Sequence, residues 1–231
     1  MAGRIARRAQ AVERRRLAAP GEPREPRWPA SLAVVAALAL YLLLPDRLVV
    51  GPKWVVPALE FALLLPLTVT TPHRHRNETR FGRITSLVLV GLVNLANVAS
   101  LVLLVHFLLA GGKTQGRELI LSSIEIYMTN VLIFGLWYWE LDQGGPGARL
   151  LPEPGTPDFL FPQMNAPDKA EEGWKPGFVD YLYVSFTNAT AFSPTDTMPL
   201  RQRAKLLMGI QAAASLITVA LVAARAVNIL S

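Results

Sequence analysis

Long apolar segments recur along this chain, and each approaches the length of a helix that crosses a membrane. The segments are residues 28–50, 54–71, 84–110, 118–141 and 206–230. About 20 residues of α-helix cross the roughly 30 Å hydrocarbon layer of a bilayer. Because backbone polar groups cannot stay unpaired in lipid, the sequence predicts an all-α, polytopic membrane protein with about five transmembrane helices.

The composition supports a lipid environment. Hydrophobic residues make up 52% of the chain and charged residues only 17%, which is outside the range of soluble domains. A net charge of +6 would suggest a nucleic-acid partner in a soluble protein, but here the arginines flank the apolar segments. We therefore expect the lipid bilayer, and no nucleic acid, as a partner.

The chain divides into four regions. Residues 1–28 form a basic tail with eight arginines, and residues 29–141 hold four of the apolar segments. Residues 142–177 are rich in proline and glycine and carry six acidic residues, so we expect a water-facing linker without regular structure. Its one apolar patch, residues 158–164, would either lie on the membrane surface or fold over a neighbouring helix. Residues 178–231 contain a short amphiphilic helix, a turn and the last transmembrane helix.

Basic residues predict the orientation of the chain, because they are enriched in cytoplasmic loops. The arginine-rich tail and the loop at residues 72–83, with four arginines, would lie on the same side. We expect a multi-pass bacterial inner-membrane protein with a cytoplasmic N-terminus. After four crossings, the linker and the turn near Asp196 would also be cytoplasmic.

Polar side chains recur inside the fourth apolar segment. Glu118, Ser122, Glu125 and Thr129 follow one another at spacings of four, three and four residues. This spacing places them on one helix face, which should point toward the interior of the bundle.

Other apolar segments also carry polar groups at membrane depth, namely Glu60, Asn94, Asn97 and Arg225. A pair between Arg225 and either Glu60 or Glu125 would avoid two isolated buried charges. Two interpretations are open: the polar groups form hydrogen bonds between helices, or they line an ion or proton pathway in which Glu125 is a relay.

Motifs for catalysis are not found in the sequence. It holds no glycine-rich phosphate loop and no His-Glu-x-x-His, and it has no cysteine. His73 and His75 have no third metal ligand nearby. We therefore expect neither an enzyme nor a cofactor or metal site.

The stretch 178–228 has the densest pattern. Its segment from Tyr183 to Pro199 resembles the pore helix and filter of two-helix potassium channels. The matching positions are Tyr183, Ser185, Thr190, Asp196 and Pro199, followed by Leu206, Leu207 and Gln211 on the inner helix. The resemblance implies a pore helix, a turn that contains Asp196 and a partner helix.

The stretch departs from this family in the filter. Ser193, Pro194 and Thr195 stand where the family has Gly-Tyr-Gly. The family's filter strips water from potassium with backbone carbonyls, in a conformation that uses the freedom of glycine. Pro194 has a fixed φ and no N–H, so a conventional potassium filter is not expected.

The same stretch is also similar to a family of uncharacterised bacterial integral membrane proteins. In that family a short aromatic-rich helix, a Ser/Asp turn and a basic segment precede a helix that ends as Ala226-Val227-Asn228 does here. This resemblance implies no activity. A third interpretation is that residues 178–192 form a helix in the membrane interface, without a pore.

The predicted orientation conflicts with a potassium-channel pore loop, which enters the membrane from outside. Three explanations are open. Residues 178–194 cross the membrane, an upstream apolar segment does not cross, or the channel resemblance is misleading about orientation.

Two functions follow from these patterns. The first is an ion-channel-like module in which Thr190, Ser193, Thr195 and Asp196 line or shape a constriction and small ions are the partners. It needs a homo-oligomer, a tetramer by analogy, because one pore helix cannot enclose a path. The second is a membrane protein of structural, sensing or transporter-accessory kind, in which Asp196 only caps a turn.

Overall fold

The computed structural model describes residues 28–58, 80–110, 116–149, 155–166, 168, 170, 174–191 and 196–230, with only the backbone for 80, 81, 116 and 225–230. Most of these residues are helical, which confirms the predicted α class. In chain order the elements are α2 (Trp28–Leu43), η1 (Asp46–Leu48), α4 (Arg80–Leu109), α5 (Gly116–Leu141), η2 (Asp142–Gly144), α6 (Pro146–Arg149), β1 (Phe159–Leu160), α7 (Pro162–Asn165), α8 (Phe178–Ala191), β2 (Met198–Pro199) and α9 (Gln202–Leu230).

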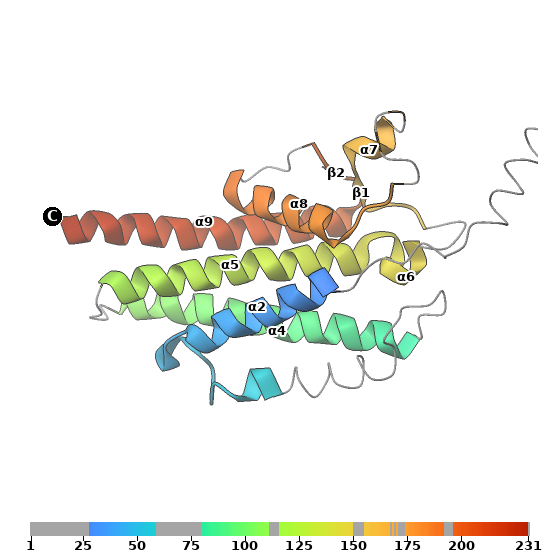
Figure 1. Ribbon diagram of the computed structural model, residues 1–231. Helices are drawn as coiled ribbons and strands as arrows, with labels where there is room; N and C mark the ends of the chain where they lie inside the picture. The colour runs from blue at the N-terminus through green and yellow to red at the C-terminus, as the bar shows by residue number, and fades with distance from the viewer. Residues whose placement is uncertain are drawn as a thin grey trace, which may run out of the picture.

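Helix α5 lies at the centre of the bundle and packs against α2, α4, α8 and α9 (Figure 1). It is antiparallel to all four. One apolar cluster joins the C-terminal half of α5 to the beginning of α2, α4, α8 and α9, and includes Ile133, Phe134 and Tyr138. A second cluster joins the beginning of α5 to the ends of α2 and α4 and includes Leu119 and Ile126.

Three of the described helices are long and apolar enough to cross a membrane. These segments are Gly82–Leu109, Arg117–Gly144 and Gln202–Ala224. They coincide with the third, fourth and fifth apolar segments of the sequence, which is compatible with a membrane protein. The second predicted segment, beyond Ala58, lies outside the described residues.

The first apolar segment forms a shorter helix than we predicted. Helix α2 has 16 residues and ends at Leu43, whereas the expected helix reached Val50. Pro45 disfavours a helical conformation at the residue before it, and the chain then turns into η1. At about 1.5 Å per residue, α2 is about 24 Å long, which is less than the ~30 Å of a hydrocarbon layer.

The region from residue 142 to 177 differs from the predicted irregular, water-facing linker. It forms η2, α6, β1 and α7, and β1 pairs with β2 in an antiparallel ladder that joins Phe159 to Pro199. Phe159 and Phe161 are buried against the aromatic rings of Tyr138 and Tyr181. The expectation of an irregular, water-facing segment therefore does not hold for the described part of this region. Residues 159–161 fold back onto the helices, which is one of the two alternatives expected for the apolar patch 158–164.

Candidate functional site

Helix α8 is inserted into the bundle from one end without running through it. It has 14 residues, which is about 21 Å of helix. Phe159 of β1 contacts the ring of Tyr181, near the beginning of α8, and the chain after α8 returns to pair with the same strand. The backbone N–H of Leu200 donates to the Asp158 carbonyl at 2.7 Å. The chain therefore leaves and regains the same end of the bundle around α8 (Figure 1).

This path bears on the first of the three explanations for the orientation conflict. Helix α8 does not carry the chain from one end of the bundle to the other, because β2 and the start of α9 lie beside the end of α5. The linker and the beginning of α9 are consequently at the same end, as the arginine pattern predicts.

A buried set of six polar residues connects α5, α8 and α9, and we call it the polar layer. Its centre is Gln211 on α9, whose side chain is fully buried. The amide nitrogen of Gln211 donates to the Ser185 hydroxyl at 2.7 Å and to the Ser185 carbonyl at 2.9 Å. Its amide oxygen accepts from the Tyr138 hydroxyl at 2.6 Å and from the Asn188 amide at 2.8 Å. The two other members are Asn130 and Ser215.

Further hydrogen bonds extend the polar layer on both sides of Gln211. The Ser185 hydroxyl donates to the Val131 carbonyl at 2.6 Å, and the Asn188 amide donates to the Met208 carbonyl at 3.0 Å. Asn130 donates to the Ser215 hydroxyl at 2.9 Å. Buried amides and hydroxyls are costly without partners, so this pairing fixes the depth and rotation of α8 against its two neighbours.

A glycine allows α5 and α8 to approach closely beside the polar layer. A Cβ atom at Gly135 would lie 3.2 Å from the Leu182 Cα and 3.2 Å from its Cδ1. The first of these contacts is with backbone, which cannot rotate away. A larger residue at position 135 would therefore require Leu182 to shift by a few tenths of an ångström, so Gly135 favours the present helix separation.

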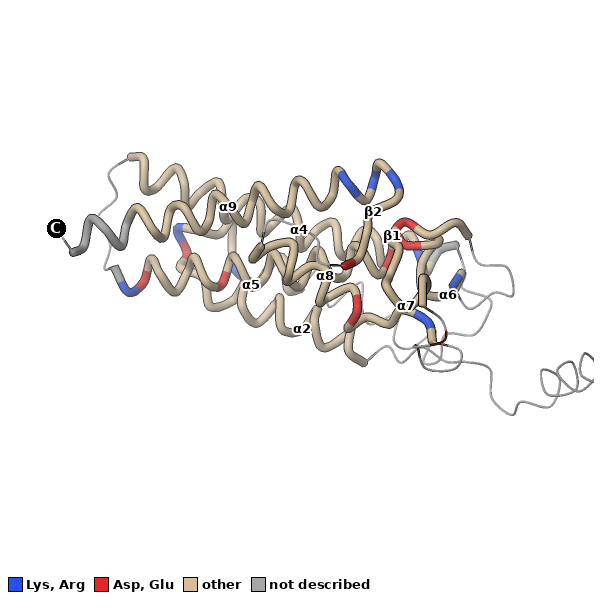
Figure 2. Tube along the Cα trace, turned by 90° about the horizontal axis from the view of Figure 1, so that it is seen from above, with Lys and Arg blue, Asp and Glu red and all other residues tan. Residues whose placement is uncertain are grey.

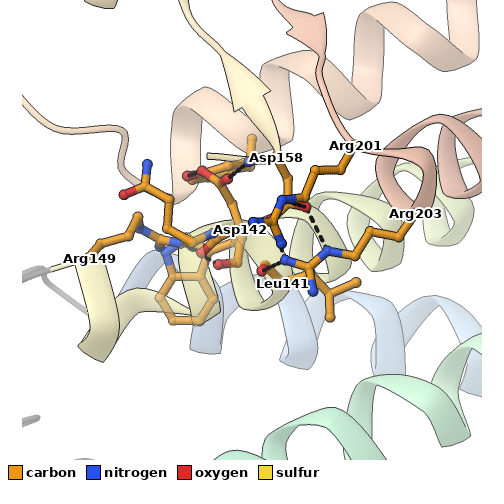
Figure 3. A network of polar contacts seen from close by, with 9 residues as sticks. Leu141, Asp142, Arg149, Asp158, Arg201 and Arg203 are labelled. Carbon is orange, nitrogen blue, oxygen red and sulfur yellow. Dashed lines mark hydrogen bonds and ion pairs between the residues drawn. The ribbon is translucent and has the colours of Figure 1, made fainter. Parts of the chain in front are cut away.

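A second polar cluster closes the end of the bundle, and Figure 3 shows its contacts. We call it the Asp158 clasp; it consists of Asp142, Arg149, Asp158, Tyr181 and Arg203. The Asp158 carboxylate, which is 1% exposed, accepts from the Arg203 Nε at 2.6 Å and from its Nη2 at 2.5 Å. Such a bidentate ion pair between a guanidinium and a carboxylate is strong and directional.

Asp142 and Arg149 complete the clasp from the end of α5. The Asp142 carboxylate accepts from the Asp158 N–H at 2.6 Å and from the Tyr181 hydroxyl at 2.5 Å. Arg149 donates to the Trp139 carbonyl at 2.7 Å and lies over the Tyr181 ring at 5.0 Å. The clasp thus ties the linker, the start of α8 and the start of α9 to the end of α5.

The beginning of α8 carries one titratable group with a shifted pKa. The Gly177 N–H donates to the Asp180 carboxylate at 2.8 Å, three residues along, as at many helix N-termini. Burial raises the pKa of Asp180, and the hydrogen bond from Gly177 opposes this shift only in part.

The residues predicted to shape a pore lie at or beyond the end of α8. Thr190 is exposed, and its hydroxyl donates to the Phe186 carbonyl of its own helix at 2.9 Å. Asp196 is also exposed. Ser193, Pro194 and Thr195 lie outside the described residues, so the filter-like turn stays a prediction.

The predicted polar face of α5 is only partly inward. Ser122 and Thr129 are buried, but Glu118 and Glu125 are half-buried. Glu118 forms an ion pair of 2.7 Å with Arg47 near the end of the bundle opposite the clasp. In the described part of the chain, the Glu125 Oε2 is buried and has no hydrogen-bond partner.

Of the other predicted intramembrane groups, the structure describes only the two asparagines of α4. Asn97 is buried and Asn94 is half-buried on α4. Glu60 and the Arg225 side chain lie outside the described residues, so the proposed ion pair of Arg225 with Glu60 or Glu125 stays a prediction. Among residues with described positions, no group of His, Asp or Glu side chains could hold a metal ion.

Our sequence interpretation did not identify most of the polar layer or the clasp. It named Ser185 and Gln211 only through the channel resemblance, and it treated Asp142 and Asp158 as solvated. A usable signal was present, because Asn130, Gln211 and Ser215 each interrupt apolar helix segments and Asp158 directly precedes Phe-Leu-Phe. Polar residues in such positions usually have buried partners.

The arrangement as a whole positions a short helix; within the described ranges it does not assemble a nucleophile, a base or a ligand set. Comparison of the chain with protein-family models, curated proteins and solved structures gave no match in any of the three.

Proposed function

We propose that this chain is the subunit of an oligomeric membrane protein whose C-terminal module conducts ions. The observation that carries the proposal is the short helix α8, which enters the bundle from one end and is held there by the polar layer. Helices that penetrate only part of a membrane are tolerated where protein or a watery cavity surrounds them, and they are common at conduction sites.

The apolar side chains exposed on the outward face of α8 favour an oligomer. Val179, Tyr183 and Phe186 are exposed on this helix, as are Leu206 and Ile210 on α9. In a single subunit these side chains have no protein cover in the described part of the chain. Copies arranged around α8 would cover part of this face and would place several turns of residues 192–196 near one axis.

The chemistry of the turn favours cations over anions. Asp196 is an exposed carboxylate directly after the three residues that replace the filter glycines. Rings of acidic side chains are a recurring selectivity device in cation channels. Thr190, Ser193 and Thr195 add hydroxyl groups, so the proposed path offers side-chain oxygens in place of a file of carbonyls.

A second candidate is a non-conducting membrane protein of structural, sensing or transporter-accessory kind. It is favoured by the inward orientation of Ser185 and Asn188, because the Ser185 hydroxyl and the Asn188 amide nitrogen bond to α5 or α9. In this case the polar layer only fixes α8, and the exposed apolar face meets lipid.

Conductance of the purified protein in a planar bilayer separates these candidates. We expect cation currents that fall several-fold in Asp196→Asn, while Asp168→Asn, which changes an exposed acidic residue of the linker, leaves them unchanged. A correctly folded protein without current, or currents that both variants reduce equally, would exclude the proposed path through the turn.

A further inference from the structure

The beginning of α9 carries a concentration of positive charge at one end of the bundle. Figure 2 shows basic residues grouped there, and they are Arg201, Arg203 and Lys205. Arg203 is neutralised by Asp158, which accepts both of its hydrogen bonds. The remaining two charges therefore decide what this surface attracts.

Arg201 and Lys205 keep most of their charge available. The Arg201 Nε is 3.8 Å from an Asp158 oxygen that already accepts from Arg203, and the Arg201 side chain is 44% exposed. Lys205 is exposed, and no ion pair joins it to an acidic group in the described part of the chain, including Asp196. The two residues are one helical turn apart, because the Lys205 N–H donates to the Arg201 carbonyl at 3.1 Å.

From Lys205 toward the C-terminus, the same helix face carries a row of small and apolar residues, which we call the apolar track. Residues spaced by four, three and four positions share a face, and these are Gly209, Ala212 and Leu216. Gly209 and Leu216 are exposed and Ala212 is half-buried. A Cβ at Gly209 would meet nothing within 4 Å, so the track is open where it adjoins the two cations.

We propose that Arg201 and Lys205 bind the phosphate of an anionic phospholipid whose acyl chain lies along Gly209, Ala212 and Leu216. The two cations match the negative charge of the lipid headgroup, and the apolar track that follows them along α9 matches the acyl chain. This inference rests on the membrane location that the proposed function requires.

The test compares phosphatidylglycerol with phosphatidylcholine by native mass spectrometry of the full chain, released from nanodiscs of either lipid. Each basic residue near an anionic headgroup is worth about 1 kcal/mol, so Arg201→Gln/Lys205→Gln should weaken phosphatidylglycerol retention about 30-fold. Lys205→Arg should retain the preference. Arg117→Gln, which removes an exposed charge at the opposite end of the bundle, should have no effect.

A second variant tests the track independently of charge. Gly209→Leu places a side chain in open space, so it should leave folding intact and reduce retention of both lipids while preserving the preference for phosphatidylglycerol. Equal retention of the two lipids by the natural chain would overturn the inference, as would an equal effect of Arg117→Gln. Flotation with vesicles distinguishes the two proposals: a chain that does not float refutes both, whereas one that floats without lipid preference refutes only this one.

Discussion

The Gln211 side chain donates to the Ser185 hydroxyl at 2.7 Å and thereby joins α9 to α8 in a buried environment. The same amide also accepts from Tyr138 on α5. One side chain thus links three helices. Its replacement should therefore affect the stability of the whole C-terminal half.

Gln211→Leu should lower the free energy of unfolding by about 2–4 kcal/mol, because the Tyr138 hydroxyl and one N–H of the Asn188 amide lose their buried acceptor; the Met208 carbonyl still accepts from Asn188. Tyr138→Phe removes only one donor, since Asn188 still bonds to the amide, and should cost about 1 kcal/mol. Thermal or denaturant unfolding in detergent micelles measures both. The control is Gln202→Leu at the exposed start of α9, and a Gln211→Leu effect no larger than that of Tyr138→Phe would contradict the central role of Gln211.

The close approach of α5 and α8 should be sensitive to one methyl group. Gly135→Ala places its Cβ 3.2 Å from the Leu182 backbone, so we expect a loss of about 1–2 kcal/mol and a displaced α8. Gly209→Ala is the matched control, because it makes the same helix-favouring change where nothing lies within 4 Å. Unfolding measurements that rank the two variants equally would show that this contact relaxes freely.

Breaking the clasp should release the linker from the bundle. In Asp158→Asn the Arg203 guanidinium loses its charged acceptor, and we expect a loss of about 2–3 kcal/mol. Hydrogen exchange at the amides of Asp158 and Leu200 should accelerate, since both bond within this region. Asp168→Asn, at an exposed position, serves as the control. Unchanged exchange at both amides would show that the β1–β2 ladder holds the linker on the bundle without the ion pair between Asp158 and Arg203.

Asp180 should make the free energy of unfolding fall as the pH rises. Its pKa is raised in the folded state by burial, so the folded state binds this proton more tightly than the unfolded state. Asp180 therefore makes its full contribution to stability below its pKa in the unfolded state, which is about 4. This contribution is lost as the pH rises through its pKa in the folded state.

Asp180→Asn cannot ionise, so it avoids the loss of stability at high pH, and its side-chain oxygen still accepts from the Gly177 N–H. We expect the variant to melt at the same or a higher temperature than the natural chain at pH 7, with the difference vanishing near pH 4. Melting curves at the two pH values test this. A variant that is less stable at pH 7 would mean that the ionised carboxylate is favourable in α8.

The long helices α4, α5 and α9 and the short helix α8 could be predicted from the sequence, because each is mostly apolar and contains no proline over its whole length. The fold of residues 142–177 could not. Its structure depends on Asp158 meeting Arg203, 45 residues away in the chain, and on Phe159 meeting Tyr138. Neither contact leaves a periodic pattern, and the proline content favoured an irregular segment.

The residues of the candidate site could also be predicted only in part from the sequence. The spacing of Glu118, Ser122, Glu125 and Thr129 correctly indicated one helix face, but only Ser122 and Thr129 are buried. The face that meets α8 and α9 instead carries Asn130 and Tyr138. Periodicity predicts which residues share a face, whereas the choice of the face that packs depends on neighbours that join later in the chain.

The orientation of α5 against all four of its neighbours has an electrostatic consequence for the end that holds the clasp. Helices α2, α4, α8 and α9 begin at this end, whereas α5 finishes there (Figures 1 and 2). Each helix N-terminus carries a partial charge of about +0.5 from its aligned peptide dipoles. Asp158 bonds to the first turn of α9, so the positive end of that helix favours its negative charge. Asp142 instead follows the negative end of α5 directly, so its carboxylate depends on the Tyr181 hydroxyl and the Asp158 N–H as donors.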